Sequence, residues 1–349
     1  MAKAYQHKLA QLKDREHPFA PYVRILGKGK TGSRSLSGDE AFTAMRMILA
    51  GEVEDLQLGA FLMLLRVKEE SAEELCGFVR AAREHIDAPV GEIAVDLDWS
   101  SYAGKKRQLP WFLLSCFALA DQGVRVFMHG ASGHTMGRLY TDDVLRQLNI
   151  PTASNWDDVK TQLQDSQFSF MPLEVLSPEL KRIMDFRNYL GLRSPVHTLS
   201  RLLNPLAADY SMQSIFHPSY ADSHQRAALT LNQPHAAVFK GEGGEIERKP
   251  EAVCTVKRVD KGNAFEQAWP RLLEGRQLQP EHLDIDALRA LWRGGSSSHT
   301  LPHADTPYAE MAVIGTLAIA LELLGKAPGP EEAMVLAREW WQQRNRDRL

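Results

Sequence analysis

The sequence predicts an α/β fold in which a small all-helical N-terminal lobe precedes a larger α/β lobe with a mainly parallel central sheet. Apolar residues recur at helical spacing through residues 39–85, whereas from residue 93 short apolar runs alternate with helical patterns. With 349 residues and 44% hydrophobic content, the chain can build a core in each lobe. The expected divisions are a charged extension over residues 1–23, a helical lobe over residues 24–90 joined by part of residues 165–195, and an α/β lobe over residues 91–349.

Three main helices are predicted in the helical lobe. Residues 39–50 and 56–67 repeat apolar side chains at helical spacing. The third helix opens with the capping box Ser-Ala-Glu-Glu at residues 71–74 and runs to about His85, and Pro89 then interrupts the pattern.

Strand, helix and strand in succession predict a parallel sheet with crossover helices in the second lobe. The expected strands are residues 93–97, 124–128, 168–171, 214–216 and 236–239. The expected helices are residues 110–121, 142–148, 178–189, 312–324 and 330–349.

Composition predicts a cytoplasmic protein that does not enter membranes. The three cysteines, Cys76, Cys116 and Cys254, have no metal-type spacing and suit a reducing compartment. The N-terminus has no apolar signal core, and the apolar runs are too short to span a bilayer. His299 and His303 lack a nearby Cys or carboxylate partner, so no metal site is predicted.

The net charge of −3 by itself argues against a nucleic-acid-binding protein, because such proteins are usually basic. The basic residues are nevertheless segregated: residues 17–38, 99–120, 122–141 and 186–208 contain no Asp or Glu. Either these segments converge into a positive surface, or they are ordinary loops and core strands. Their candidate cations are Lys28, Lys30, Arg34, Lys105, Lys106, Arg107, Arg138, Arg187, Arg193 and Arg201.

Three groups of motifs carry a resemblance to a known family. They are the helical signature at residues 51–68, the strand and His-Gly turn at residues 123–130, and the segment that combines Arg187 and Arg193 with Asn204-Pro205. Together they resemble the anthranilate phosphoribosyltransferase family, also called glycosyltransferase family 3, over about residues 24–345. The resemblance implies an anthranilate phosphoribosyltransferase-like two-lobed fold and a homodimer formed through the helical lobes.

The segments that bind substrate in that family are altered here. Family enzymes hold phosphoribosyl pyrophosphate on a Gly-Thr-Gly-Gly-Asp loop, because glycines let backbone N–H groups approach the pyrophosphate. The corresponding residues 99–103 are Trp-Ser-Ser-Tyr-Ala. The family's Lys-His-Gly-Asn-Arg becomes Met-His-Gly-Ala-Ser at residues 128–132, and its magnesium-binding Asp-Glu pair becomes Gly244-Glu245. These changes predict that the family reaction is lost.

Basic residues remain around the altered loop, and this pattern resembles the YbiB-type branch of the family, whose members lack the enzyme signature and bind nucleic acid. We therefore predict non-catalytic, largely sequence-independent binding of nucleic acid, DNA in particular, by the ten cations named above, with no cofactor. Trp99 and Tyr102 either stack on bases or pack in the core. Residues 105–107 are alternatively a solvated loop, and Arg187 and Arg193 alternatively hydrogen-bond buried carbonyls.

The competing hypothesis is a phosphoribosyltransferase or related glycosyltransferase with a divergent, magnesium-dependent site. That site would contain Ser100, Ser101, His129, Gly130, Arg187 and Glu245. The same positive cleft would also serve a small anionic metabolite, and the sequence does not choose among DNA, RNA and such a ligand.

Overall fold

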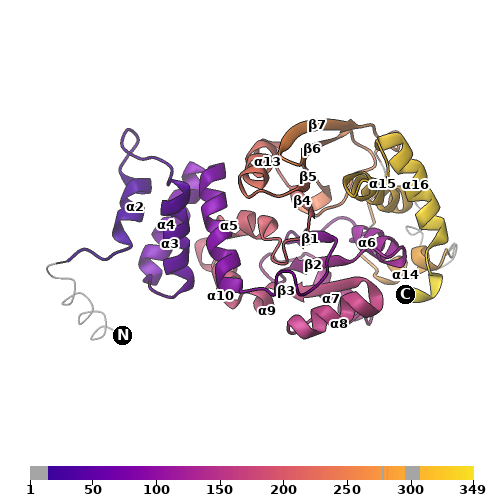
Figure 1. Cartoon of the computed structure of the whole chain (residues 1–349), viewed down its shortest axis with the longest axis horizontal. Coiled ribbons are helices and arrows are strands. Elements are labelled where there is room, and N and C mark those ends of the chain that lie inside the picture. The colour runs from indigo at the N-terminus through magenta and orange to yellow at the C-terminus, as the bar shows by residue number, and fades with distance from the viewer. Residues whose placement is uncertain (1–14, 277–278, 281, 295–306) are drawn as a thin grey trace.

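The computed structural model describes residues 15–276, 279–280, 282–294 and 307–349 (Figure 1). The first 14 residues of the predicted extension, as well as His299 and His303, lie outside these ranges.

The predicted helical lobe is present at the N-terminal end of the described chain (Figure 1). Its helices are α2 (Ala20–Gly27), α3 (Gly38–Leu49), α4 (Asp55–Lys68) and α5 (Ala72–Ile86). Capping boxes begin α3 and α5, since Ser37 and Ser71 each exchange hydrogen bonds with the Glu three residues later. The short helices that follow the third strand pack into the same apolar cluster. They are α9 (Leu173–Leu176), α10 (Pro178–Asp185), α11 (Arg187–Leu190) and α12 (Val196–Leu199).

A seven-stranded sheet forms the second lobe, in the order β3-β2-β1-β4-β5-β6-β7. The parallel strands are β1 (Leu97–Ser101), β2 (Val126–Gly130), β3 (Phe168–Pro172), β4 (Tyr210–Ile215) and β5 (His235–Lys240). The antiparallel strands are β6 (Cys254–Asp260) and β7 (Asn263–Trp269). The expectation of a mainly parallel sheet is confirmed, whereas the terminal hairpin was not predicted.

Several element boundaries differ from the prediction. The fourth strand begins at Tyr210 rather than at residue 214, the helix predicted over residues 178–189 is divided into α10 and α11, and the helix predicted to begin at residue 312 begins at Pro307. The first strand begins at Leu97 rather than at residue 93, because Ile93 packs into the helical-lobe core and Asp96 is held by the guanidinium of Arg125 at 2.7 Å. The last helix, α16 (Pro330–Gln343), ends six residues early, and a short 3-10 turn, Arg346–Arg348, follows it.

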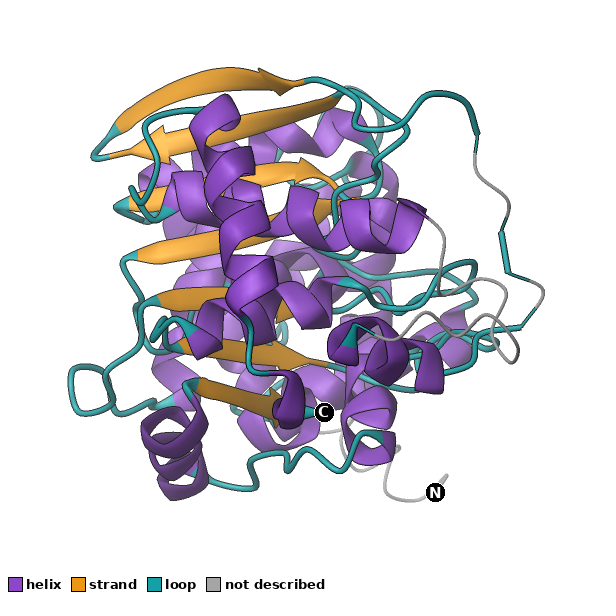
Figure 2. Cartoon of the chain, turned by 90° about the vertical axis from the view of Figure 1, so that its right-hand side faces the viewer, coloured by secondary structure: helices purple, strands orange, loops and turns teal. Residues whose placement is uncertain are grey.

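Helices cover both faces of the sheet (Figure 2). One face packs against α6 (Phe112–Asp121), α7 (Thr141–Gln147), α14 (Asp286–Arg293), α15 (Pro307–Leu323) and α16. The other face shares its apolar core with the helical lobe, α8 (Trp156–Ser166) and α13 (Ala221–Thr230). None of the described helices combines the length and the apolar composition needed to cross a bilayer.

The strand order reverses between β1 and β4. From β1 the chain proceeds outward to β2 and β3, and then returns to place β4 on the other side of β1. In open α/β sheets, ligands bind beyond the carboxyl ends of the strands at such a switch point. The fold therefore directs attention to the loops after Ser101 and Ile215.

Candidate functional site

The loop after β1 contains a backbone anion site that the chain itself fills. The N–H groups of Ala103 and Gly104 donate to Oε1 of Glu245 at 2.7 and 2.6 Å, and Ser101 Oγ donates to Oε2 at 2.9 Å. Consecutive N–H groups of this kind form an anion-binding nest. The Glu245 side chain is buried, so its carboxylate occupies the position that an external anion would need.

Two glycines let Glu245 reach this loop. Gly244 has a φ of +89°, a left-handed backbone conformation that residues other than glycine rarely adopt. A Cβ at Gly241 would overlap the Glu245 carbonyl oxygen. The tight 3-10 turn Glu242–Gly244 thus carries Glu245 from the end of β5 to the end of β1.

Lys105 is buried and belongs to a second internal ion pair. Its Nζ lies 2.6 Å from Glu247 Oε1, and Glu247 Oε2 accepts the N–H of Phe112, at the start of α6, at 3.0 Å. Burial raises the pKa of Glu247 to about 7, opposed by the attraction of Lys105. Lys105 is 1% exposed, so the interpretation of residues 105–107 as three surface cations is corrected. Lys106 and Arg107 are exposed and form no ion pair with the described residues.

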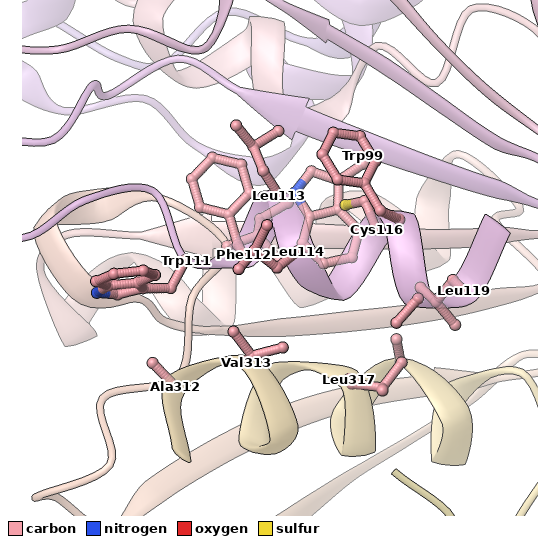
Figure 3. Packing of buried hydrophobic residues seen from close by; sticks show 14 of the residues in the cluster. Trp99, Trp111, Phe112, Leu113, Leu114, Cys116, Leu119, Ala312, Val313 and Leu317 are labelled. Carbon is pink, nitrogen blue, oxygen red and sulfur yellow. The ribbon is translucent and has the colours of Figure 1, made fainter. Parts of the chain in front are cut away.

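The aromatic residues of the same loop are core residues. Trp99 is fully buried and stacks on Phe112, with the ring centroids 6.2 Å apart, within the cluster that α6 forms with α15 (Figure 3). Tyr102 is also buried, and its hydroxyl lies 2.6 Å from His129 Nδ1. The stacking of bases on Trp99 and Tyr102 is therefore excluded in this structure, and the packing alternative holds.

The residues of the alternative phosphoribosyl site lie near one another but are engaged internally or buried. His129 sits between Tyr102 and Asp98, whose Oδ1 is 3.2 Å from Nε2. Ser100 is fully buried beneath the loop. A side chain at Gly130 would collide with the Ser101 carbonyl, so β1 and β2 approach too closely there to admit a ligand.

Magnesium does not fit these residues. Both oxygens of Glu245 already accept hydrogen bonds from the chain, and the position of the family's Asp is Gly244. Within the described ranges, no group of three or more His, Cys, Asp or Glu side chains could hold a metal ion.

Four arginines lie close to one another, and two of them, Arg193 and Arg201, line a pocket between the lobes. Arg138 donates to the carbonyls of Ala103, Gly104 and Gly243, and Arg187 donates to the carbonyl of His134 at 2.8 Å. Arg201 donates to the carbonyls of Ser214 and Gly244 at 2.9 and 2.8 Å. These contacts are those of the carbonyl-binding alternative. The buried carboxylate of Glu245 also attracts Arg201, without forming an ion pair with it.

Arg193 is the arginine without a partner: it makes no hydrogen bond or ion pair with any described residue. Burial, together with repulsion from Arg201, Arg138 and Arg187, lowers its pKa to about 10. The lowered pKa reports a cluster of like charges in which none of the four forms an ion pair with a carboxylate in the described part of the chain.

A pocket of ≈ 130 Å³ lies beside this cluster at the carboxyl end of β4. Arg66 and Glu70 of the helical lobe line it together with the end of β4. Sequence reasoning missed most of its lining, because the residues come from distant segments and share no motif. The lining residues are Arg66, Glu70, Tyr102, Arg193, Ser194, His197, Thr198, Arg201, Ser214, Ile215, Phe216, His217, Tyr220 and His224.

The N-terminal cations do not join the cluster. Lys28 and Lys30 are exposed in the connection between α2 and α3, at the end of the helical lobe that is remote from the sheet (Figure 1). Arg34 is paired with Glu40 through contacts of 2.6 and 2.7 Å, which lower the pKa of that carboxyl to about 2.

Comparison with known proteins assigns the chain to a family. Two family models match it: the helical bundle domain of a glycosyl transferase family at residues 21–86, and the a/b domain of a glycosyl transferase family at residues 112–272. In the solved structure of anthranilate phosphoribosyltransferase from Thermus thermophilus, 94% of the chain superposes on 93% of this one, with a TM-score of 0.74 and 22% identity.

Sequence relatives extend over most of the chain. An uncharacterized protein of Aquifex aeolicus is 31% identical over 74% of this chain and 77% of its own length. The uncharacterized protein YbiB of Escherichia coli is 28% identical over 70% of this chain and 77% of its own. The anthranilate phosphoribosyltransferase of Desulfitobacterium hafniense is 30% identical over 88% of this chain and 90% of its own. The chain therefore belongs to glycosyltransferase family 3, the anthranilate phosphoribosyltransferase-like family.

Proposed function

We propose that this protein binds nucleic acid through the cleft between its lobes without catalysing a reaction, as a member of the YbiB-type branch of the family. The carrying observation is the convergence of Arg138, Arg187, Arg193 and Arg201 without an ion-paired carboxylate among the described residues. A cluster of four guanidinium groups that form no ion pair within the described part of the chain favours a polyanion. Contacts of this kind address the phosphate backbone, which accounts for binding that is largely independent of sequence.

Lys106 and Arg107 extend the proposed surface. They follow the loop whose carbonyls hold Arg138, and both side chains are exposed. The remote Lys28 and Lys30 have no role in this cleft.

A phosphoribosyltransferase is the weaker alternative. Its pyrophosphate would need the N–H groups of Ala103 and Gly104, which already donate to Glu245. Displacing a buried carboxylate from three hydrogen bonds leaves a desolvated charge without partners, which is energetically costly. The internal occupant thus favours binding without catalysis.

Fluorescence anisotropy of labelled DNA and RNA oligonucleotides between about 50 and 200 mM salt tests the proposal. We expect log affinity to fall steeply with log salt. Arg193→Gln should weaken binding by about tenfold and reduce the salt slope by about 1, since one phosphate contact is lost. The double variant Lys106→Ala/Arg107→Ala should also weaken it, whereas Arg338→Gln, an exposed arginine on α16, should not. Absence of binding by the wild-type protein at low salt contradicts the proposal.

Calorimetry with phosphoribosyl pyrophosphate and magnesium separates the two candidate functions. We expect no heat of binding. A saturable signal would restore the transferase alternative, and a small anionic metabolite would be indicated if only such ligands bound.

We also propose that the protein is a homodimer formed through its helical lobes. Helix α4 is apolar on its buried side and again on its outer side, where Leu56 and Val67 are 74% and 84% exposed. Ala60 and Met63 lie between them at helical spacing, which makes a continuous apolar stripe of Leu56, Ala60, Met63 and Val67. A second copy would cover this stripe and duplicate the positive cleft.

A further inference from the structure

The pocket at the carboxyl end of β4 has a volume of ≈ 130 Å³, which is below the ~300 Å³ of ordinary small-molecule sites and is sufficient for one anionic group. We propose that it receives a phosphomonoester and, on the basis of the proposed function, that this group is the terminal phosphate of a nucleic-acid strand.

The charge of the pocket suits a phosphomonoester. Arg66, Arg193 and Arg201 line it, and Glu70 is the carboxylate among its lining residues. Arg193 has no partner in the described chain, and Arg66 reaches the Tyr220 hydroxyl at 3.4 Å. Three guanidinium groups against one carboxylate leave an excess positive charge that a dianion neutralises better than the single charge of an internal phosphodiester.

Unsatisfied polar atoms in the pocket wall provide a second, independent indication of a ligand. Ser194 Oγ and His197 Nε2 have no hydrogen-bond partner among the described residues, although the two residues are 5% and 7% exposed. A buried polar group without a partner is costly, so such groups gather where a ligand completes them. Hydroxyl and imidazole groups beside arginines are suitable donors to phosphate oxygens.

The mouth of the pocket can hold the base that adjoins the phosphate. Phe216 is 48% exposed at the rim, and its ring lies 4.9 Å from that of His217. Both follow β4 directly, so the strand end that supplies Ser214 to the wall also supplies the aromatic rim. Stacking on these rings requires an unpaired terminal base, because the faces of a base within a duplex are already stacked on the neighbouring bases.

Anisotropy with single-stranded oligonucleotides of about 12 nucleotides tests the inference. Three forms, each labelled at an internal base, carry a 5′-phosphate, a 3′-phosphate or neither. We expect one phosphorylated form to bind about tenfold more tightly than the unphosphorylated form, as expected for charge-assisted bonds to a terminal phosphate. Arg193→Gln should abolish the difference, and Ser194→Ala should reduce it, whereas Arg338→Gln should preserve it.

The outcomes separate this inference from the proposed function. Equal affinities for all three oligonucleotides overturn the strand-end inference and leave nucleic-acid binding intact, while no binding of any form overturns the proposed function itself. Inorganic phosphate that erases the preference at matched ionic strength supports recognition of the phosphate group. If inorganic phosphate binds in an Arg193-dependent manner but the three oligonucleotides bind equally, the pocket recognises a phosphate group that does not come from the end of a strand.

Discussion

At the scale of single residues, Glu245 determines what the loop after β1 can bind. The sequence identified this residue as the surviving half of a metal-binding pair. Its carboxylate instead accepts hydrogen bonds from Ser101, Ala103 and Gly104. A loop without the family's glycines can thus still present adjacent N–H groups to an anion, and the anion here is part of the chain.

Replacing Glu245 should open this nest. We expect Glu245→Ala to bind inorganic pyrophosphate in calorimetry, whereas the wild-type protein gives no signal, because the freed N–H groups need an acceptor. The free energy of unfolding should fall by about 1–3 kcal/mol without the ligand. Glu242→Ala, which removes a partly exposed carboxylate from the same turn, is the control and should do neither. If Glu245→Ala gives no heat of binding with pyrophosphate, the prediction is wrong and the loop does not keep its N–H groups available without the carboxylate.

At the scale of elements, the Lys105–Glu247 pair joins the β1 loop to the start of α6 and to the turn after β5. Glu247 accepts the first N–H of α6, a position where helices favour negative charge. Removing Lys105 would leave Glu247 buried and unpaired, at a cost of about 3–5 kcal/mol. If a Lys105 variant bound nucleic acid more weakly, the loss of stability would explain the result. Lys106 and Arg107 are therefore the residues of this segment to substitute in binding experiments.

Glu247 should also make stability depend on pH. Its pKa of about 7 in the folded protein exceeds the ordinary value of 4.5, so the folded state binds more protons than the unfolded state between these values. The contribution of Glu247 to the free energy of unfolding should therefore fall as pH rises from about 4.5 to 7, by at most ~3 kcal/mol. Urea titrations across this range should show that Glu247→Gln removes this decline, with Glu92→Gln, at an exposed carboxylate, as control. Parallel pH profiles for wild type and Glu247→Gln would contradict the prediction.

At the scale of the whole molecule, the lobes contribute different functions. The α/β lobe supplies Arg138, and the short helices that pack with the helical lobe and their connection supply Arg187 and Arg193. The helical lobe also supplies Arg66 and Glu70 to the pocket lining, as well as the apolar stripe of α4. A dimer through that stripe would place two positive clefts on one particle, so that a single strand could engage both.

The stripe yields a direct test of assembly. Light scattering coupled to gel filtration should show a dimer for the wild-type protein and a monomer for Leu56→Glu/Val67→Glu, since two buried carboxylates oppose an apolar interface. Val335→Glu, at an exposed apolar residue of α16, should remain dimeric. A monomeric wild-type protein at micromolar concentration would contradict the proposed interface.

Local patterns identified most elements of the fold but not the terminal hairpin. The capping box at Ser71 and the apolar repeats of α3 and α4 act within a few residues of one another, so the sequence reveals them. Strand β7 is largely exposed and alternates weakly, and therefore gives little apolar signal. Its Lys261-Gly262 turn, with both residues at positive φ, was the available clue.

By itself, the sequence determined the family, the two-lobed α/β architecture and the loss of the glycine-rich loop, because these depend on local patterns and on motifs in order along the chain. Only the tertiary structure decided which candidate residues are free to meet a ligand. Lys105 and Lys106 are adjacent in sequence, yet one is buried against Glu247, 142 residues away, and the other is exposed. Burial and pairing between distant segments are set by packing, and packing also brought Arg193 into a cluster of arginines, none of which forms an ion pair with a carboxylate in the described part of the chain.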